Sequence, residues 1–537
     1  MKDPKRILAE VESLMEGHRY YHAEKRLHEA LELSRDEKTK QQTLLLQAKL
    51  AIVQGDPTIG VLISDLKGLL DLDITIETKA EVLHVLGRAE LAMGHYPEVE
   101  HFLQESLSLF RELQNSKAIF SVLHSKAVFA VHQGHWDKTK ELVAELLKLA
   151  GASGDSVGYG RALMAWAAYE RNRGFHDLAR DHYKLASQLF EEVEDNLGLA
   201  VALNNLADIE IMRGDLSNGL YLLQRALFHE WLIGIPRNLT LALTQIGRIH
   251  MLKGNLQDAE SFLRAAINLA SPDQARNPII YYYSLCNFAD FERKRGKLDQ
   301  ALQLAQDAIS LLERRDISGS DLGYAWGTVT SILLEMKDTS QAEKALTTGE
   351  LICNSLDFKE GIVNNILLRG ILELQKDNLG LAQEYLAVAQ KKAEENELLQ
   401  VQIQTELALA GLYLCKLTLE FDSVAQANAT DCLLRASHLA EQTALEPEKL
   451  EAQILEAVAH SINLNFEKAV EILRAVEARA QSLELRLIEE KAGKIKGPIL
   501  SRMRVMGISR EPDEEMLNYI VKAQEYIAEA QVALMKP

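Results

Sequence analysis

The segment from residue 203 to residue 227 reads LNNLADIEIMRGDLSNGLYLLQRAL and contains the elements of a repeating unit. At its centre stands Gly214, a residue type that takes the left-handed conformation in which one helix ends and the next begins. Ala207 lies seven positions before this glycine, and Gly219 and Ala226 lie five and twelve positions after it. Because seven residues are two helical turns, Gly219 and Ala226 share one face of the second helix. The stretch therefore predicts two helices that pack closely across a tight turn.

The same pattern recurs about every forty residues. Glycines at the predicted turns lie 38 to 42 residues apart, at Gly17, Gly55, Gly94, Gly134, Gly174, Gly214, Gly254 and Gly296. The series continues without glycine at Lys337-Asp338, Asp377-Asn378 and Leu464-Asn465. Small residues stand seven positions before most turns, at Ala48, Gly87, Ala127, Ala167, Ala207, Gly247, Ala289, Gly370 and Ala457. A period of this length predicts an array of stacked helix pairs rather than several unrelated domains.

This pattern resembles the tetratricopeptide repeat in its lengthened form of about 40 residues, as in MalT-like, kinesin-light-chain-like and Pins-like superhelices. The resemblance rests on units such as Leu206-Ala207 with Gly214-Asp215-Leu216, and residues 254–259, GNLQDA, with Ala265-Ala266. It departs from the family pattern because most units lack the closing proline and because the first two and last three units are degenerate. The resemblance implies a curved stack of helix pairs and a role in binding proteins, but it names no partner.

We therefore predict an all-α fold, a right-handed α-α superhelix of about twelve antiparallel helix pairs with a C-terminal capping helix. The repeats are expected over residues 1–484, and residues 485–537 form the capping segment, with its last helix at 513–534. Gly493, Gly497 and Pro498 are expected to interrupt the pattern there. Residues 151–160 contain four glycines and have two interpretations, an ordinary loop between repeats or a hinge.

Charge and composition exclude several classes of protein. The 537 residues include 59 Lys and Arg against 78 Asp and Glu, a net charge of −19. A general nucleic-acid binder or anionic-membrane binder needs positive faces, so neither partner is expected. No apolar run is long enough to span a bilayer, and the four cysteines have no C-x-x-C spacing. We expect a cytoplasmic protein without disulfides, metal or cofactor.

Motifs for catalysis are absent from the sequence. It has no phosphate-binding G-x-x-x-x-G-K-[ST] loop, no G-x-S-x-G and no H-E-x-x-H. The leading hypothesis is therefore a non-catalytic scaffold or adaptor that binds a protein or peptide partner. A sensory or regulatory module, as the MalT-like resemblance implies, is the alternative. An enzyme built on a histidine cluster and a self-assembling stack are the remaining hypotheses.

In such a stack the first helix of each pair lines the concave groove, and the exposed positions lie about 3, 6, 10 and 13 residues before each turn. This rule gives the candidate partner-binding residues: His84, Arg88, Arg161, Met164, Arg171, Asn204, Asp208, Arg248, Tyr283, Asp290 and Arg293. Five are arginines, whose planar guanidinium groups suit bidentate binding of carboxylates, so a partner segment with acidic residues is expected. The competing interpretation is that these arginines pair with acidic residues of adjacent helices, as Arg293 with Asp290.

Overall fold

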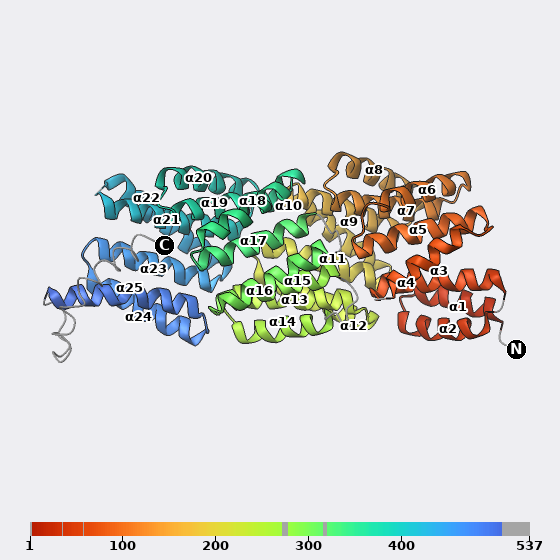
Figure 1. Cartoon of the computed structure of the whole chain (residues 1–537), viewed down its shortest axis with the longest axis horizontal. Helices are drawn as coiled ribbons and strands as arrows, with labels where there is room; N and C mark the ends of the chain where they lie inside the picture. The colour runs from red at the N-terminus through yellow and green to blue at the C-terminus, as the bar shows by residue number, and fades with distance from the viewer. Residues whose placement is uncertain are drawn as a thin grey trace.

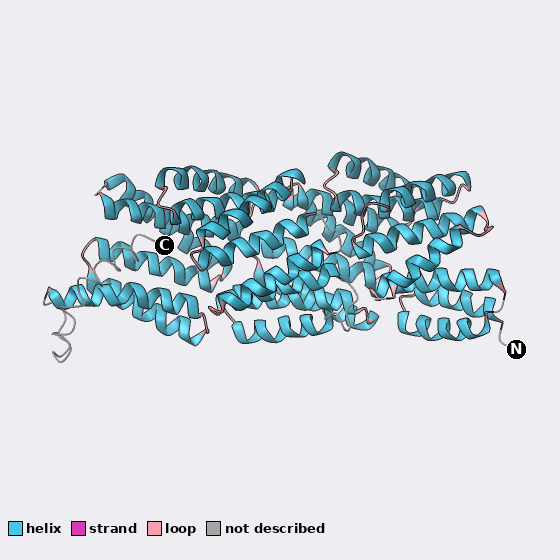
Figure 2. Ribbon diagram, viewed as in Figure 1, coloured by secondary structure: helices cyan, strands magenta, loops and turns pink. Residues whose placement is uncertain are grey.

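The structure is a computed structural model that describes residues 3–34, 36–56, 58–270, 278–314, 319–420 and 422–506. Over these ranges the chain forms twenty-five α-helices and no β-strand (Figure 2). The odd-numbered helices, which open each pair, are α1 (Pro4–Glu16), α3 (Glu37–Gln54), α5 (Ile76–Met93), α7 (Ser116–His132), α9 (Ser156–Asn172), α11 (Asn196–Met212), α13 (Pro236–Leu252), α15 (Pro278–Lys294), α17 (Ser320–Glu335), α19 (Lys359–Gln375), α21 (Leu399–Leu419), α23 (Glu446–Ile462) and α25 (Arg486–Val505). The even-numbered helices, which close each pair, are α2 (Tyr20–Leu33), α4 (Ile59–Leu70), α6 (Val99–Glu112), α8 (Trp136–Ser153), α10 (His176–Glu192), α12 (Leu216–Ile233), α14 (Leu256–Ala270), α16 (Leu298–Glu313), α18 (Thr339–Ser355), α20 (Leu379–Glu395), α22 (Ser423–Thr443) and α24 (Phe466–Ser482). The predicted all-α array of about twelve helix pairs is confirmed.

The helices form two layers that wind into a superhelix (Figure 1). Each odd helix packs on the next even helix and also on the next odd helix. Neighbouring even helices do not pack on each other comparably, so the odd helices lie closer together. Because the array bends toward its more closely spaced layer, the odd helices α1 to α25 form the concave side, which we call the inner wall. The even helices form the outer layer.

Left-handed residues join the two helices of each pair, as the sequence predicts. Seven of the eight turn glycines have positive φ, and Lys337, Asp377 and Leu464 take the same conformation in the units without glycine. Gly17 is the exception, because its φ is −83° and the neighbouring His18 has the positive φ. Side-chain caps then begin many of the helices; at α12, for example, the carboxylate of Asp215 accepts the backbone N–H of Asn218 at 3.0 Å.

The small residues seven positions before the turns allow the two helices of a pair to approach closely. A Cβ atom added at Gly87 would lie 2.6 Å from the side chain of Leu103, and one added at Gly247 would lie 2.7 Å from that of Leu263. Ala127 and Ala207, at the equivalent positions, are completely buried. These positions therefore set the distance between the layers, because a larger side chain would push the second helix outward.

The glycine-rich segment 151–160 lies mostly within helices. Helix α8 ends at Ser153, Gly154 has a φ of +64°, and Asp155 caps α9 by accepting the backbone N–H of Gly158 at 2.9 Å. Gly158 and Gly160 belong to α9, where a Cβ added at Gly160 would lie 2.9 Å from the ring of Phe190. Close packing is therefore one reason for glycine in this segment.

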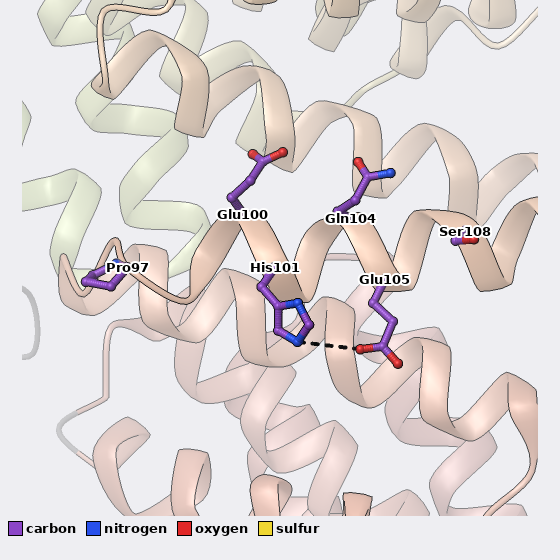
Figure 3. A pocket seen from close by; sticks show the side chains of 6 residues that line it. All are labelled: Pro97, Glu100, His101, Gln104, Glu105 and Ser108. Atoms are coloured by element: carbon purple, nitrogen blue, oxygen red, sulfur yellow. Dashed lines mark ion pairs between the residues drawn. The ribbon is translucent and has the colours of Figure 1, made fainter.

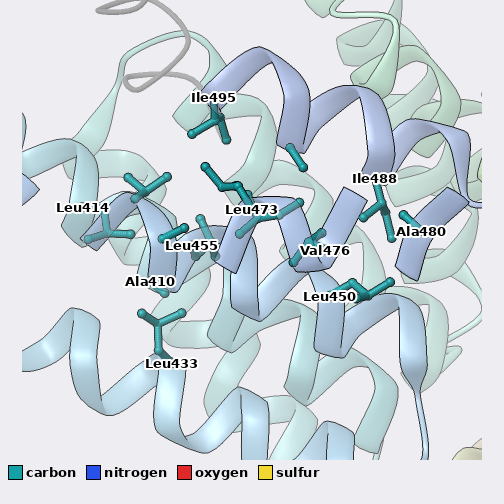
Figure 4. Close-up of a cluster of buried hydrophobic side chains, with 14 of the residues drawn as sticks. Ala410, Leu414, Leu433, Leu450, Leu455, Leu473, Val476, Ala480, Ile488 and Ile495 are labelled. Carbon is teal, nitrogen blue, oxygen red and sulfur yellow. The ribbon is translucent and has the colours of Figure 1, made fainter. Parts of the chain in front are cut away.

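The C-terminal part continues the array further than the sequence suggests. We expected Gly493, Gly497 and Pro498 to interrupt the pattern, but α25 runs through all three without a break. Ile488 and Ile495 of α25 join the hydrophobic core of α21 to α24 (Figure 4). The stabilisation from this packing exceeds the cost of the helix hydrogen bond that Pro498 cannot donate. The capping helix expected at 513–534 lies outside the described residues.

Successive turns of the superhelix touch each other along a line that we call the seam. It consists of the pairs Trp136–Leu356, Arg173–Asp357, Arg213–Glu397 and Arg295–Glu484. The indole Nε1 of Trp136 donates to the backbone oxygen of Leu356 at 3.1 Å, and the remaining pairs are ion pairs. Arg173 lies just before α10 and Asp357 lies just after α18, so two segments far apart in the sequence meet here. The seam joins the turn inside one repeat to the loop between two later repeats.

Candidate functional site

All eleven candidate residues from the sequence lie on helices of the inner wall. They come from α5, α9, α11, α13 and α15, which are consecutive odd helices except for α7. Their placement follows from the helical period, because a fixed offset from the turn selects a fixed face of the first helix. The structure separates them into an ion-pair network, an aromatic surface, one buried residue and a group of basic residues.

An ion-pair network occupies the centre of the inner wall. Asp208 of α11 lies 2.5 Å from Arg171 and 3.6 Å from Arg248, on the helices at either side. Arg171 also lies 3.7 Å from Glu360, which belongs to α19 in the next superhelical turn. Burial alone would lower the pKa of Arg171, but the carboxylates of Asp208 and Glu360 hold it above its ordinary value. Both guanidinium groups are therefore neutralised within the protein.

A second ion-pair group lies on α15. Arg293 contacts Asp290, one turn earlier on the same helix, at 2.7 Å, and Glu335 of α17 at 3.2 Å. These contacts agree with the interpretation that inward arginines pair with acidic residues of the protein itself. Three of the five inward arginines, Arg171, Arg248 and Arg293, thus have carboxylate partners on the inner wall itself.

Tyr283 and Met164 contribute apolar surface to the inner wall. The ring of Tyr283 lies 6.3 Å from that of Tyr324 on α17, measured between centroids, and both rings are half-buried. Arg248 lies beside both hydroxyl groups. Met164 of α9 is also half-buried and packs against the core between α9 and α12. These side chains combine apolar area with polar edges, as peptide-binding surfaces do.

Asn204 is not exposed on the inner wall, contrary to the sequence prediction. Only 2% of its surface is accessible, and its side-chain amide donates to the carboxyl group of Glu230 on α12. The side chains ten residues before the turn are half-exposed in three other units, at His84, His124 and Met164. In the next unit the equivalent residue, Thr244, is fully buried and hydrogen bonds to Ser284 of the next odd helix. The offset rule therefore fails where neighbouring helices cover that position.

The buried pair of Asn204 and Glu230 makes stability depend on pH. Burial raises the pKa of Glu230 to about 8, against the opposing effect of the hydrogen bond from Asn204. Since the folded-state pKa exceeds that of the unfolded chain, the contribution to stability is complete below about pH 4.5 and is lost as the pH rises toward 8. Replacement Glu230→Gln is expected to leave stability unchanged near pH 4.5 and to raise it by roughly 3 kcal/mol at pH 7.

Urea unfolding at pH 4.5, 7 and 8 measures this difference. The exposed Glu471 of α24 supplies the control, because Glu471→Gln is expected to change stability little at any of these pH values. An effect of Glu230→Gln that is the same at all three pH values would contradict an uncharged, buried carboxyl group.

A basic group lies at the N-terminal end of the inner wall. Arg88 and His84 come from α5, and Arg161 comes from α9; His124 of α7, which the candidate set omitted, lies between them. His84 and His124 are 40 residues apart and both lie ten residues before a turn, so the offset rule selects His124 as well. Burial lowers the pKa of His84 well below its ordinary value and that of His124 to about 4, so both rings are neutral at pH 7.

A shallow hollow lies on the outer layer, and Figure 3 shows it from close by. His101 and Glu105 lie one turn apart on α6, 3.7 Å from each other, and Glu100 accepts hydrogen bonds from Lys126 and Lys138. The lining residues are Pro97, Glu100, His101, Gln104, Glu105 and Ser108. Since a single helix and the loop before it supply all of them, the hollow has no opposing wall to enclose a ligand.

No group of three or more metal-ligating side chains is found within the described ranges. Among the helices that the structure describes, none has the length and apolar character needed to cross a bilayer.

Comparison with known proteins identifies the repeats. Residues 237–410 match the model of the MalT-like TPR region, and residues 158–227 match a model of the tetratricopeptide repeat. No curated protein matches the sequence. The structure is similar to that of a Rap protein complexed with competence and sporulation factor, with a TM-score of 0.51 and 15% identity over 68% of this chain and 99% of that chain.

Two structures of NprR are similar at lower scores. The apo form of this quorum sensor from B. thuringiensis has a TM-score of 0.41 and 13% identity, over 66% of this chain and 99% of that chain. NprR in complex with its cognate peptide NprX has a TM-score of 0.45 and 13% identity, over 66% and 100%. At these identities the likeness concerns the fold alone. Residues 158–227 thus match tetratricopeptide repeats, and residues 237–410 match repeats of the MalT-like type.

Proposed function

We propose that this protein is a non-catalytic binding protein that holds an extended peptide segment of a partner protein against its inner wall. The observation that carries the proposal is the half-buried pair Tyr283 and Tyr324, which presents aromatic area on the concave side of consecutive helices. Backbone and side chains of an extended peptide bind well to such amphipathic rings because their few rotamers cost little entropy on binding. The ion-paired arginines beside them supply a polar border.

The comparisons supply supporting analogy. The Rap protein, whose fold is similar, was solved in complex with competence and sporulation factor. Repeats of this type serve many pathways, so the proposal rests on the inner wall rather than on the fold. A partner segment with acidic residues fits the basic group at Arg88 and Arg161, and the cytoplasm is the proposed location.

A sensory role is the second candidate, and the MalT-like match and the seam favour it. Because the seam ties adjacent superhelical turns, a ligand that changes the curvature of the inner wall must also strain or relax the seam. In that case a bound peptide would alter the superhelical pitch and so the partner surfaces. Small-angle scattering with and without the peptide distinguishes this module from a rigid adaptor.

Affinity purification from the native cell with matched variants tests the proposed function. The variant Tyr283→Ala/Tyr324→Ala alters the inner wall, whereas Tyr221→Ala/Phe228→Ala removes two exposed rings from α12 in the outer layer. We expect the first variant to lose the partner by at least tenfold and the second to retain it. The bound partner is also expected to slow hydrogen exchange in the odd helices. Equal capture by both variants would contradict binding on the inner wall.

A further inference from the structure

Two turn glycines touch the next superhelical turn at distances that leave no room for a side chain. A Cβ atom added at Gly134 would lie 2.8 Å from the backbone oxygen of Leu356. One added at Gly214 would lie 2.5 Å from the methyl carbon of Thr443 and 2.7 Å from the side chain of Leu399. Because non-bonded carbon atoms pack best at about 3.5–4.0 Å, even one methyl group would force the two superhelical turns apart. Leu356, Leu399 and Thr443 all lie at helix ends beside loops between later repeats.

The atoms that these glycines meet are held in place. At Gly134 the nearest atom is the backbone oxygen of Leu356, which also accepts the hydrogen bond from Nε1 of Trp136. At Gly214 the nearest side chain is that of Thr443, which is buried, and its hydroxyl group donates to a backbone oxygen one helical turn earlier at 2.8 Å. The β-branched side chain of Thr443 is also stiff. An added methyl group must therefore be accommodated by moving whole superhelical turns rather than one side chain.

An arginine precedes the glycine in three turns of the seam and holds the contact from beside it. Each arginine pairs with a carboxylate on the next superhelical turn, in the pairs Arg173–Asp357, Arg213–Glu397 and Arg295–Glu484. The first two pairs both join residues 184 positions apart, so the contact recurs with the repeats. All three acidic residues have positive φ in loops between repeats. The seam thus repeats one arrangement, an arginine-glycine turn against an acidic loop.

Other residues replace glycine in turns that lie outside the seam. The left-handed residues there are Lys337, Asp377 and Leu464, and all three are exposed. Gly134 and Gly214, by comparison, are partly buried. The left-handed backbone favours glycine but does not require it in this array. The close approach of a later superhelical turn is the feature that separates the two groups of turns.

We propose that Gly134 and Gly214 are stops that set the pitch of the superhelix. Adjacent superhelical turns approach until the glycine meets the later loop, and the hydrogen bond of Trp136 and the arginine pairs then hold them at that distance. Since each repeat contributes only a small rotation to the array, a side chain at either stop is accommodated by a longer pitch rather than by an unfolded helix. The inference does not depend on what the inner wall binds.

Pulsed electron paramagnetic resonance across the seam tests the proposal. Spin labels are attached at Gln224→Cys on α12 and Leu434→Cys on α22, two exposed positions on the helices that meet at the Gly214 contact. The four native cysteines are buried, so the labels react with the introduced ones. In the variant Gly134→Ala/Gly214→Ala we expect the mean distance between the labels to increase by at least about 1 Å, the overlap that each added Cβ must relieve.

The matched control is Gly154→Ala/Gly234→Ala. These glycines are also left-handed, with φ of +64° and +74°, but nothing lies within 4 Å of a Cβ added to either. The control carries the same kind of backbone strain and is expected to keep the wild-type distance. Circular dichroism establishes that each variant is folded; if the double variant at the stops does not fold, Gly214→Ala is compared with Gly234→Ala. An unchanged or shorter distance in the folded stop variant, or an equal increase in the control, overturns the proposal.

Discussion

Replacement Gly198→Ala is expected to destabilise the protein by about 2 kcal/mol, although alanine is the better helix former. Gly198 lies on α11, where an added Cβ would meet the ring of Phe190 at 2.5 Å. Phe190 is completely buried, and a Cβ added at Gly160 of α9 would also meet its ring, at 2.9 Å. Since the ring is held between two helices, it cannot move aside to make room. The added methyl group must therefore separate α9, α10 and α11.

The matched control is Gly380→Ala in α20. Nothing lies within 4 Å of a Cβ added there, so the same chemical change is expected to stabilise by about 0.5–1 kcal/mol. Urea unfolding measures both effects, and hydrogen exchange in α9 to α11 locates the first, since repeat arrays open locally. Effects of the same sign at the two glycines would refute the proposed packing of Phe190.

Replacement Asp208→Asn is expected to cost about 3 kcal/mol, because it leaves Arg171 and Arg248 without their shared carboxylate. The side chains of Asp208, Arg171 and Arg248 are 14%, 26% and 17% exposed. Water can therefore solvate the two guanidinium groups only in part after the carboxylate is lost. Glu360, at 3.7 Å from Arg171, compensates one of the two guanidinium groups and limits the loss. Urea unfolding and the melting temperature report the change.

A second replacement distinguishes charge from packing in this network. In the background of Asp208→Asn, Arg248→Met removes one unpaired charge and keeps an extended apolar side chain, so it is expected to recover part of the lost stability. The exposed pair of Asp431 and Arg435 provides the control, where Asp431→Asn is expected to cost 0.5 kcal/mol or less, at about the exposed-pair average. Failure of Arg248→Met to recover stability would show that the network acts through its hydrogen bonds rather than its charges.

Much of the fold could be predicted from the sequence because its determinants are local. The left-handed turns, the small residues before them and the helical period lie within one 40-residue unit, as at Ala207 and Gly214. The loops between repeats were harder to recognise, since non-glycine residues such as Gln114, Glu194 and Asp357 take the left-handed conformation there. Their packing surroundings, rather than residue type, permit that backbone conformation.

The candidate site could be predicted only in part. Helix periodicity placed the candidate residues on the inner wall, but it could not identify their partners, because these lie on other helices. Glu360 belongs to the superhelical turn after that of Arg171. The pitch of the superhelix, which brings the two together, cannot be inferred from the sequence of a single repeat. The environment of Asn204 also depends on another helix, since its side-chain amide donates to Glu230 on α12. The division between paired and unpaired arginines therefore required the structure.

The seam has a kinetic consequence for any ligand of the inner wall. Where Trp136 is hydrogen-bonded to Leu356 and Arg213 pairs with Glu397, neighbouring turns are in contact, and a bound chain cannot leave sideways at these points. Such a chain must enter and leave along the superhelix axis, or it is released only when adjacent turns separate. The residence time of the ligand then depends mainly on how often adjacent superhelical turns separate, and less on the strength of the ligand's own contacts. A long-lived complex can arise in this way even from modest affinity at each subsite.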